Sequence, residues 1–83
     1  MSKNQLFHYV ARTNFGSYWA GMNSVTDQIR KAQMYNSVKA IKENVSAALR
    51  KYNKSLPTEY QITSFDIIAV QIIEGNIVES VSI

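Results

Sequence analysis

The sequence predicts an α+β fold in which a single antiparallel sheet, with the element order β-β-α-β-β, carries one long amphipathic helix on one face. Three observations support this. Residues 6–22 contain two strand-like segments separated by turn residues, residues 37–53 have apolar side chains at helical spacing, and residues 60–83 are rich in Ile, Val and Thr. Because the chain has 83 residues, we expect one domain spanning residues 1–83.

The first predicted element is a β-hairpin. The segment from Leu6 to Arg12 is rich in aromatic and β-branched residues, Asn14-Phe15-Gly16 has turn chemistry, and residues 17–22 form the second strand. Several helix N-cap residues follow between Ser24 and Asp27. A short helix or single helical turn is therefore expected over residues 27–34.

The long helix is predicted from the periodicity of its apolar residues. On a helical wheel these side chains fall within an arc of about 100°. They are Val38, Ile41, Val45, Ala48, Leu49 and Tyr52. Pro57 prevents the helix from continuing. We therefore place this helix at residues 37–53.

The C-terminal part of the chain predicts two more strands. Residues 60–73 contain no Gly or Pro, and the stretch from Phe65 to Ile73 is apolar on both strand faces, as in a central or interface strand. Glu74-Gly75-Asn76 is a predicted hairpin turn, and residues 77–83 form the last strand.

An apolar strand of this kind predicts a homodimer, because a single helix buries only one face of the sheet. Leaving the other face in water would expose a large apolar patch on a small protein. The predicted interface residues are Ile67, Ile68, Val70 and Ile72. The alternative is a monomer in which the N-terminal segment or residues 54–59 fold across the open face.

The composition offers little for catalysis. Without cysteine no disulfide forms, and His8 as the single histidine does not make a zinc site with carboxylates alone. His8 has no motif that places a Ser, Asp or Glu beside it, so we interpret it as a surface or packing residue. The three glycines lie too far apart for a phosphate-binding loop. We expect no enzymatic activity, no cofactor, no metal and no small-molecule substrate.

The same sequence predicts a cytoplasmic protein without a membrane partner. The first residues lack the apolar region and cleavage site of a signal peptide. The apolar run from Ile67 to Ile73 is too short to span a bilayer.

Charge is segregated along the chain. Residues 28–54 carry seven cations against Glu43 alone, whereas residues 55–83 carry four acids and no cation. The predicted nucleic-acid-binding residues are Arg30, Lys31, Lys39, Lys42, Arg50, Lys51 and Lys54. Lys39, Lys42, Arg50 and Lys54 form a stripe beside the apolar arc, interrupted only by Glu43. Phosphates favour such a stripe because each neutralised phosphate releases counterions. The ordinary alternative is a lysine-rich helix surface that only keeps the protein in solution.

Aromatic residues crowd the predicted hairpin. They are Phe7, Tyr9, Phe15, Tyr18 and Trp19. Rings on an open sheet face would stack on unpaired bases, which favours RNA over duplex DNA. They would equally suit a homodimer core, and for Tyr9 and Trp19 we expect ordinary core packing.

Part of the chain resembles a known group of proteins. The run Tyr18-Trp19-Ala20-Gly21, the segment from Thr26 to Ser37 and the pair Ala40-Ile41 are similar to a pattern in small β-β-α-β accessory proteins of bacteriophages and prophages. The resemblance covers roughly residues 6–50, and the last strand at residues 77–83 lies outside it. It implies a phage-type accessory protein that meets a host factor, in the host cytoplasm.

The leading hypothesis is a non-enzymatic accessory protein that binds nucleic acid, RNA rather than duplex DNA, through its basic helix face. It would thereby inhibit or modulate a host defence or regulatory system. The alternative is a direct protein–protein inhibitor of a host enzyme that binds no nucleic acid. In that case the basic helix would dock on an acidic host surface, or the acidic C-terminal segment would imitate phosphates.

Overall fold

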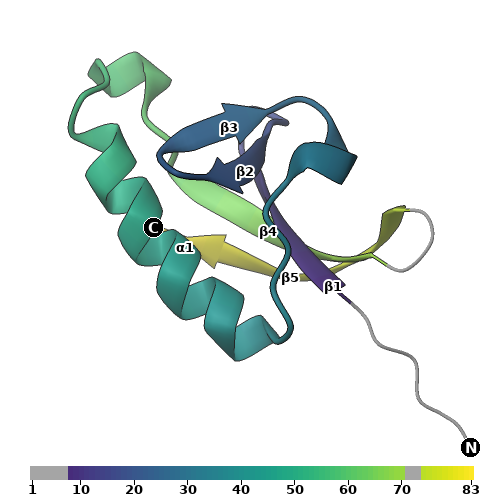
Figure 1. The fold of residues 1–83 in the computed structure, drawn as a ribbon. Helices are drawn as coiled ribbons and strands as arrows, with labels where there is room; N and C mark the ends of the chain where they lie inside the picture. Colours follow the sequence, from purple (N-terminus) through teal and green to yellow (C-terminus); the bar gives the residue numbers. More distant parts are fainter. Residues whose placement is uncertain (1–7, 71–73) are drawn as a thin grey trace, which may run out of the picture.

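The computed structural model describes residues 8–70 and 74–83, and it confirms the α+β fold (Figure 1). Within these residues five strands form one antiparallel sheet in the order β3-β2-β1-β4-β5. The strands are β1 (His8–Thr13), β2 (Tyr18–Gly21), β3 (Ser24–Thr26), β4 (Ser64–Val70) and β5 (Glu74–Ser82). The helical elements are the 3-10 turns η1 (Ile29–Lys31) and η2 (Thr58–Tyr60) and the α-helix α1 (Val38–Asn53).

Helix α1 ends at the predicted residue and begins one residue later than predicted. The side chain of Ser37 caps it by accepting a hydrogen bond of 3.1 Å from the backbone N–H of Ala40. Its buried side chains are Ile41, Val45 and Leu49, with Val38, Ala48 and Tyr52 packed partly against the same core. The predicted apolar arc is therefore the face that contacts the sheet.

The first hydrophobic core lies between α1 and the sheet. Besides the helix residues it contains Ala11, Trp19, Ile62, Phe65 and Ile67. Phe65 and Ile67 alternate with Asp66 and Ile68 along β4, and alternate residues of a strand point to opposite faces of the sheet. One face of β4 is thus covered by the helix.

The second sheet face is covered by a part of the chain that we did not expect there. Ile29 and Ala32, within and just after η1, pack against the side chains of Val10, Tyr18, Ile68 and Val70. Figure 1 shows η1 and α1 on opposite sides of the sheet. The segment between β3 and α1 therefore closes the face that would otherwise be open, in place of residues 54–59; the N-terminal segment, the other predicted cover, lies outside the described residues.

This segment is fastened to the sheet through its backbone. Strands β1 and β2 pair at Arg12 and Tyr18, and residues 33–35 lie between the two strands further along. Tyr35 and Tyr9 exchange two backbone hydrogen bonds of 2.9 Å, and the N–H of Gln33 donates to the carbonyl of Trp19 at 2.9 Å. These bonds fix the position of η1 over the second core.

One predicted helix N-cap region and one predicted turn are wrong. Residues 24–26, expected as a helix N-cap region, form strand β3, because Met22 and Asn23 both adopt left-handed φ angles of 51° and 61°. Two such residues in succession make the tight two-residue hairpin turn that matches the twist of paired strands. Residues 74–76, expected as a turn, lie within β5. The end of the predicted strand 60–73 falls on residues 71–73, outside the described residues.

Candidate nucleic-acid interface

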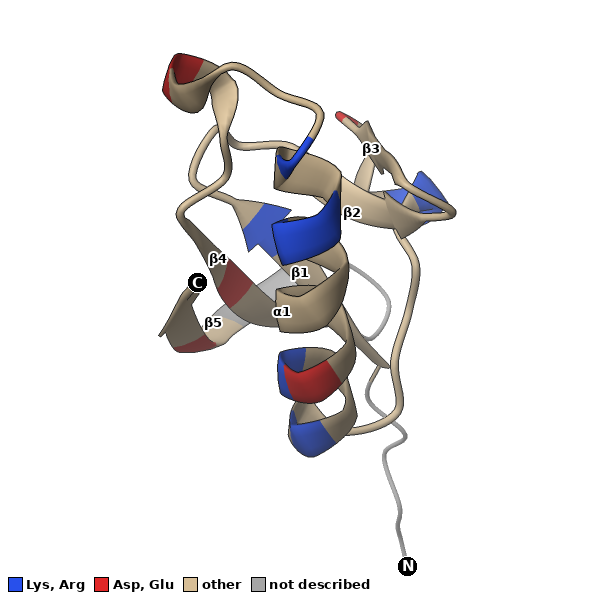
Figure 2. Ribbon diagram, turned by 90° about the vertical axis from the view of Figure 1, so that its left-hand side faces the viewer, with Lys and Arg blue, Asp and Glu red and all other residues tan. Residues whose placement is uncertain are grey.

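The structure separates the seven predicted nucleic-acid-binding residues into two sets. Lys39, Lys42, Arg50 and Lys51 lie on α1 and Lys54 follows its last residue, whereas Arg30 and Lys31 lie on η1. Since α1 and η1 cover opposite faces of the sheet, Arg30 and Lys31 are not part of the helix surface. Figure 2 shows Lys and Arg bands at both ends of α1, with an uncharged stretch between them.

The cations near the start of α1 are offset by acids. The ammonium of Lys42 forms an ion pair of 2.7 Å with the carboxylate of Glu79 on β5, and Glu43 follows directly in the sequence. Lys39 lies one turn before Glu43 on the same helix surface. The two cations and two acids of this region sum to no net charge, so the N-terminal half of α1 gives little attraction to a polyanion.

The cations at the end of α1 have no such compensation. Arg50, Lys51 and Lys54 are exposed, and no ion pair joins any of them to a described acid. The preceding stretch from Asn44 to Leu49 carries no charge. We call these three cations the basic end of α1. Their three like charges repel one another in the free protein, and an anion placed among them relieves that repulsion.

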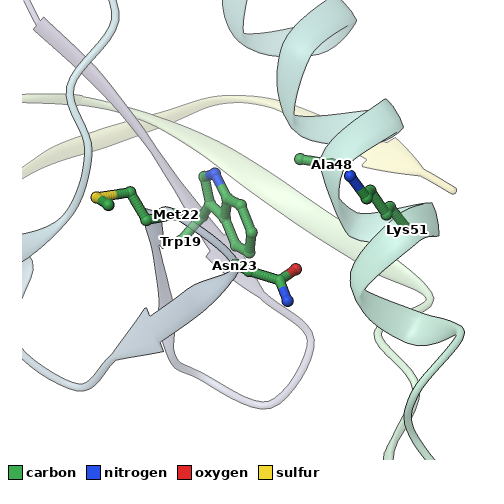
Figure 3. A pocket seen from close by; sticks show the side chains of 5 residues that line it. All are labelled: Trp19, Met22, Asn23, Ala48 and Lys51. Atoms are coloured by element: carbon green, nitrogen blue, oxygen red, sulfur yellow. The ribbon is translucent and has the colours of Figure 1, made fainter.

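A groove of about 420 Å³ lies between the basic end of α1 and the turn that joins β2 to β3. Its lining residues are Trp19, Met22, Asn23, Ala48 and Lys51. Figure 3 shows the side chains of Ala48 and Lys51 on the helix side and those of Trp19 and Asn23 opposite them on the hairpin side, while the Met22 side chain points away from α1. The groove therefore has an apolar floor at Trp19 and a cationic side at Lys51.

Trp19 forms the apolar floor and is held rigidly. It is 4% exposed and packs edge-to-face on Tyr52, with 5.8 Å between the ring centroids. Its indole N–H donates a hydrogen bond to the hydroxyl of Tyr35. Burial raises the pKa of that hydroxyl, and the hydrogen bond from Trp19 partly offsets the increase. Tyr35 is therefore neutral at physiological pH.

The hairpin side of the groove has an unusual backbone. Gly21, Met22 and Asn23 have φ angles of 80°, 51° and 61°, so three residues in a row are left-handed. A side chain at Gly21 would collide with the side-chain amide of Gln33. Met22 is 98% exposed and so adds almost nothing to the hydrophobic core. Sequence analysis missed Met22 and Asn23, although a Gly and an Asn two positions apart after a strand are a turn signal.

The aromatic residues of the hairpin are mostly structural. Tyr18 and Trp19 are buried, each in a different core, and Tyr9 is half-buried. Phe15, in the turn between β1 and β2, is the exposed ring among those described, and Phe7 lies outside the described residues. The prediction of core packing for Trp19 is confirmed. The described part of the hairpin therefore has no row of aromatic rings on an open sheet face.

The predicted dimer-interface residues are also inside the chain. Ile67 contacts the core under α1, while Ile68 and Val70 contact the core under η1, and all three are buried. Ile72 lies outside the described residues. The three described residues are therefore unavailable as a contact surface, because residues 28–34 already cover the second face of the sheet. The homodimer itself stays a prediction.

His8 is exposed at the start of β1. Among the described residues, no three His, Asp or Glu side chains come together in a group that could hold a metal ion. No helix in the described ranges has the length and apolar character needed to cross a membrane.

Comparison with known proteins adds no relative: no family model, no curated protein and no solved structure matches this chain.

Proposed function

We propose that this protein is a non-enzymatic nucleic-acid-binding protein that engages single-stranded or looped RNA at the basic end of α1. The observation that carries the proposal is the uncompensated cluster of Arg50, Lys51 and Lys54 beside the groove. Phosphates favour such a cluster because each contact releases condensed counterions. The resemblance to phage accessory proteins supports a further proposal, that RNA binding modulates a host defence or regulatory system.

The site is smaller than the stripe of seven cations that the sequence predicts. Lys42 is engaged by Glu79, and Arg30 and Lys31 lie across the sheet. Three phosphate contacts to a single strand give a slope of about −2 for the logarithm of affinity against the logarithm of salt concentration. Affinity would then fall roughly 20-fold between 50 and 200 mM salt.

Filter binding of a mixed-sequence single-stranded RNA at these two salt concentrations tests the proposal. The variant carries Arg50→Gln, Lys51→Gln and Lys54→Gln, and the matched control carries Arg30→Gln and Lys31→Gln on the opposite side of the sheet. We expect the first variant to lose both affinity and salt dependence, and the control to keep most of both. Salt-independent binding, or an equal loss in both proteins, would contradict the proposal.

A pull-down from nuclease-treated lysate examines the competing class of function. A host protein retained by this chain, together with no measurable RNA affinity, would replace RNA binding with direct protein contact. Because the basic end of α1 is the largest uncompensated charge on the helix, the same triple variant would then show whether the host protein docks there.

A further inference from the structure

We propose that the groove between α1 and the β2–β3 turn receives one unpaired base of the bound RNA, with Lys51 on an adjoining phosphate. This inference rests on the proposed function and specifies its ligand: an extruded or single-stranded nucleotide rather than a paired duplex. The groove residues are the five named above, and they come from two elements that are distant in the sequence but face each other (Figure 3).

Met22 supplies the first argument. It is 98% exposed and sits on left-handed backbone, a conformation that Gly and Asn adopt more readily. A large apolar side chain in this position does not stabilise the core, and a sparsely populated backbone conformation often marks a binding site. Its side chain points away from α1 (Figure 3), and because the thioether is flexible and polarisable it can turn to cover the face of a base that enters the groove.

Asn23 supplies the second argument. Its side chain is exposed, and its amide makes no hydrogen bond to another described residue. An amide offers both donors and an acceptor, which is the combination that reads the edge of a nucleobase. Asn23 points toward the helix side of the groove (Figure 3), so the edge of a base held between the turn and α1 would be within reach of this amide.

The opposite wall explains why the ligand carries phosphate. Lys51 lines the groove and belongs to the uncompensated basic end, with Lys54 less than one helical turn away. Ala48 is small, so the helix leaves space between Lys51 and the Trp19 floor. The volume of about 420 Å³ falls in the range of small-ligand sites. A base paired within a duplex could not enter, because its faces and its pairing edge are occupied.

The test compares three probes of similar charge: a mixed-sequence single-stranded RNA of ten nucleotides, a blunt-ended RNA duplex, whose binding the groove variants should leave unchanged, and inorganic polyphosphate, which has no bases. Met22→Gly removes the side chain and relieves the left-handed backbone. Asn23→Gly does the same for the amide. Met34→Ala is the matched control, because Met34 is also an exposed methionine but lies outside the groove. Trp19 fluorescence verifies that each variant is folded.

We expect Met22→Gly and Asn23→Gly each to weaken binding of the single strand about five- to tenfold, the low end of what one base contact contributes. Polyphosphate binding should stay within twofold, and Met34→Ala should change nothing. The inference is overturned if neither groove variant affects the single strand, or if polyphosphate binding falls equally. In either case RNA binding itself stands as long as the triple variant of the basic end loses affinity; failure of that variant overturns the proposed function instead.

Discussion

Replacing Asn53 with Ala should destabilise the fold more than an Ala substitution at an ordinary surface position of α1. On the helical wheel Asn53 falls in the polar stripe beside the cations. Its side chain nevertheless hydrogen-bonds the backbone of the segment that leads from α1 into β4. Its Nδ2 donates to the carbonyl of Ile62 at 2.8 Å, and its Oδ1 accepts from the N–H of Ile62 at 2.8 Å. Ile62 is 4% exposed and belongs to the core under α1.

The expected cost follows from these two bonds. Each contributes about 0.5–1.5 kcal/mol, so Asn53→Ala should lower the free energy of unfolding by about 2 kcal/mol. For a domain of this size such a loss lowers Tm by roughly 8–16 °C. Urea unfolding followed by fluorescence of Trp19, the single tryptophan of the chain, measures it directly.

Asn44→Ala is the matched control for this measurement. Asn44 lies on the same helix, and its amide donates to the carbonyl of Ala40 at 2.8 Å in an exposed position. Both substitutions change helix propensity in the same direction, so the difference between them reports the bonds to Ile62. We expect Asn44→Ala to shift stability by less than about 0.5 kcal/mol. If Asn53→Ala is no more destabilising than Asn44→Ala, the reasoning is refuted.

Two further predictions concern the turn and the assembly. Gly21→Ala and Gly16→Ala should each destabilise the protein by about 1–2 kcal/mol in thermal unfolding, because both glycines have left-handed φ angles. A Cβ at Gly21 meets the end of the exposed Gln33 side chain, which can move aside, and one at Gly16 meets open space. A loss of stability well below about 1 kcal/mol in either variant would contradict this. The homodimer is now expected at the outer edge of β5, where Ile77 and Val78 are about half exposed. Light scattering should then give about twice the 9.4 kDa chain mass. The double variant Ile77→Lys, Val78→Lys should have the mass of a single chain. A mass of 9.4 kDa for the unchanged chain would refute the dimer hypothesis.

The parts of the fold that could be predicted are those determined by local periodicity. The apolar spacing of α1 identified its buried face because a helix repeats every 3.6 residues whatever it packs against. The predicted start at residue 37 is one position early: Ser37 is the N-cap of α1, where its side-chain oxygen accepts from an N–H that has no partner within the helix. The apolar character of β4 on both faces indicated that both faces need to be buried, but its interpretation as a dimer interface was wrong for Ile68 and Val70, which the chain itself covers.

What covers the second face could not be predicted in the same way. Ile29 and Ala32 lie in a short segment without periodicity, and their position depends on the backbone bonds of Gln33 and Tyr35 to β2 and β1. The β2–β3 turn was missed although Gly21 and Asn23 signal it, because Met22 between them is not a residue that favours left-handed backbone and was assigned to the preceding strand. The candidate site was predicted too broadly for a related reason: the pairing of Lys42 with Glu79 joins residues 37 positions apart, and a wheel of the helix alone does not contain Glu79.

A role of Arg50 and Lys51 in RNA binding has to be distinguished from a role in stabilising α1. Arg50 and Lys51 lie in the last turn of α1, where cations stabilise a helix by interacting with its dipole, typically by 0.3–1 kcal/mol each. A structural role would therefore appear as a small loss of stability that grows weaker with added salt. Arg30 and Lys31 hold the same position in the last turn of η1, but η1 is a single turn with little dipole. If net charge alone governed binding, removing either pair would lower the affinity for RNA equally. An RNA affinity that depends on Arg50 and Lys51 far more than on Arg30 and Lys31 would therefore place the RNA at the basic end of α1, and the groove variants then decide whether a base enters the groove.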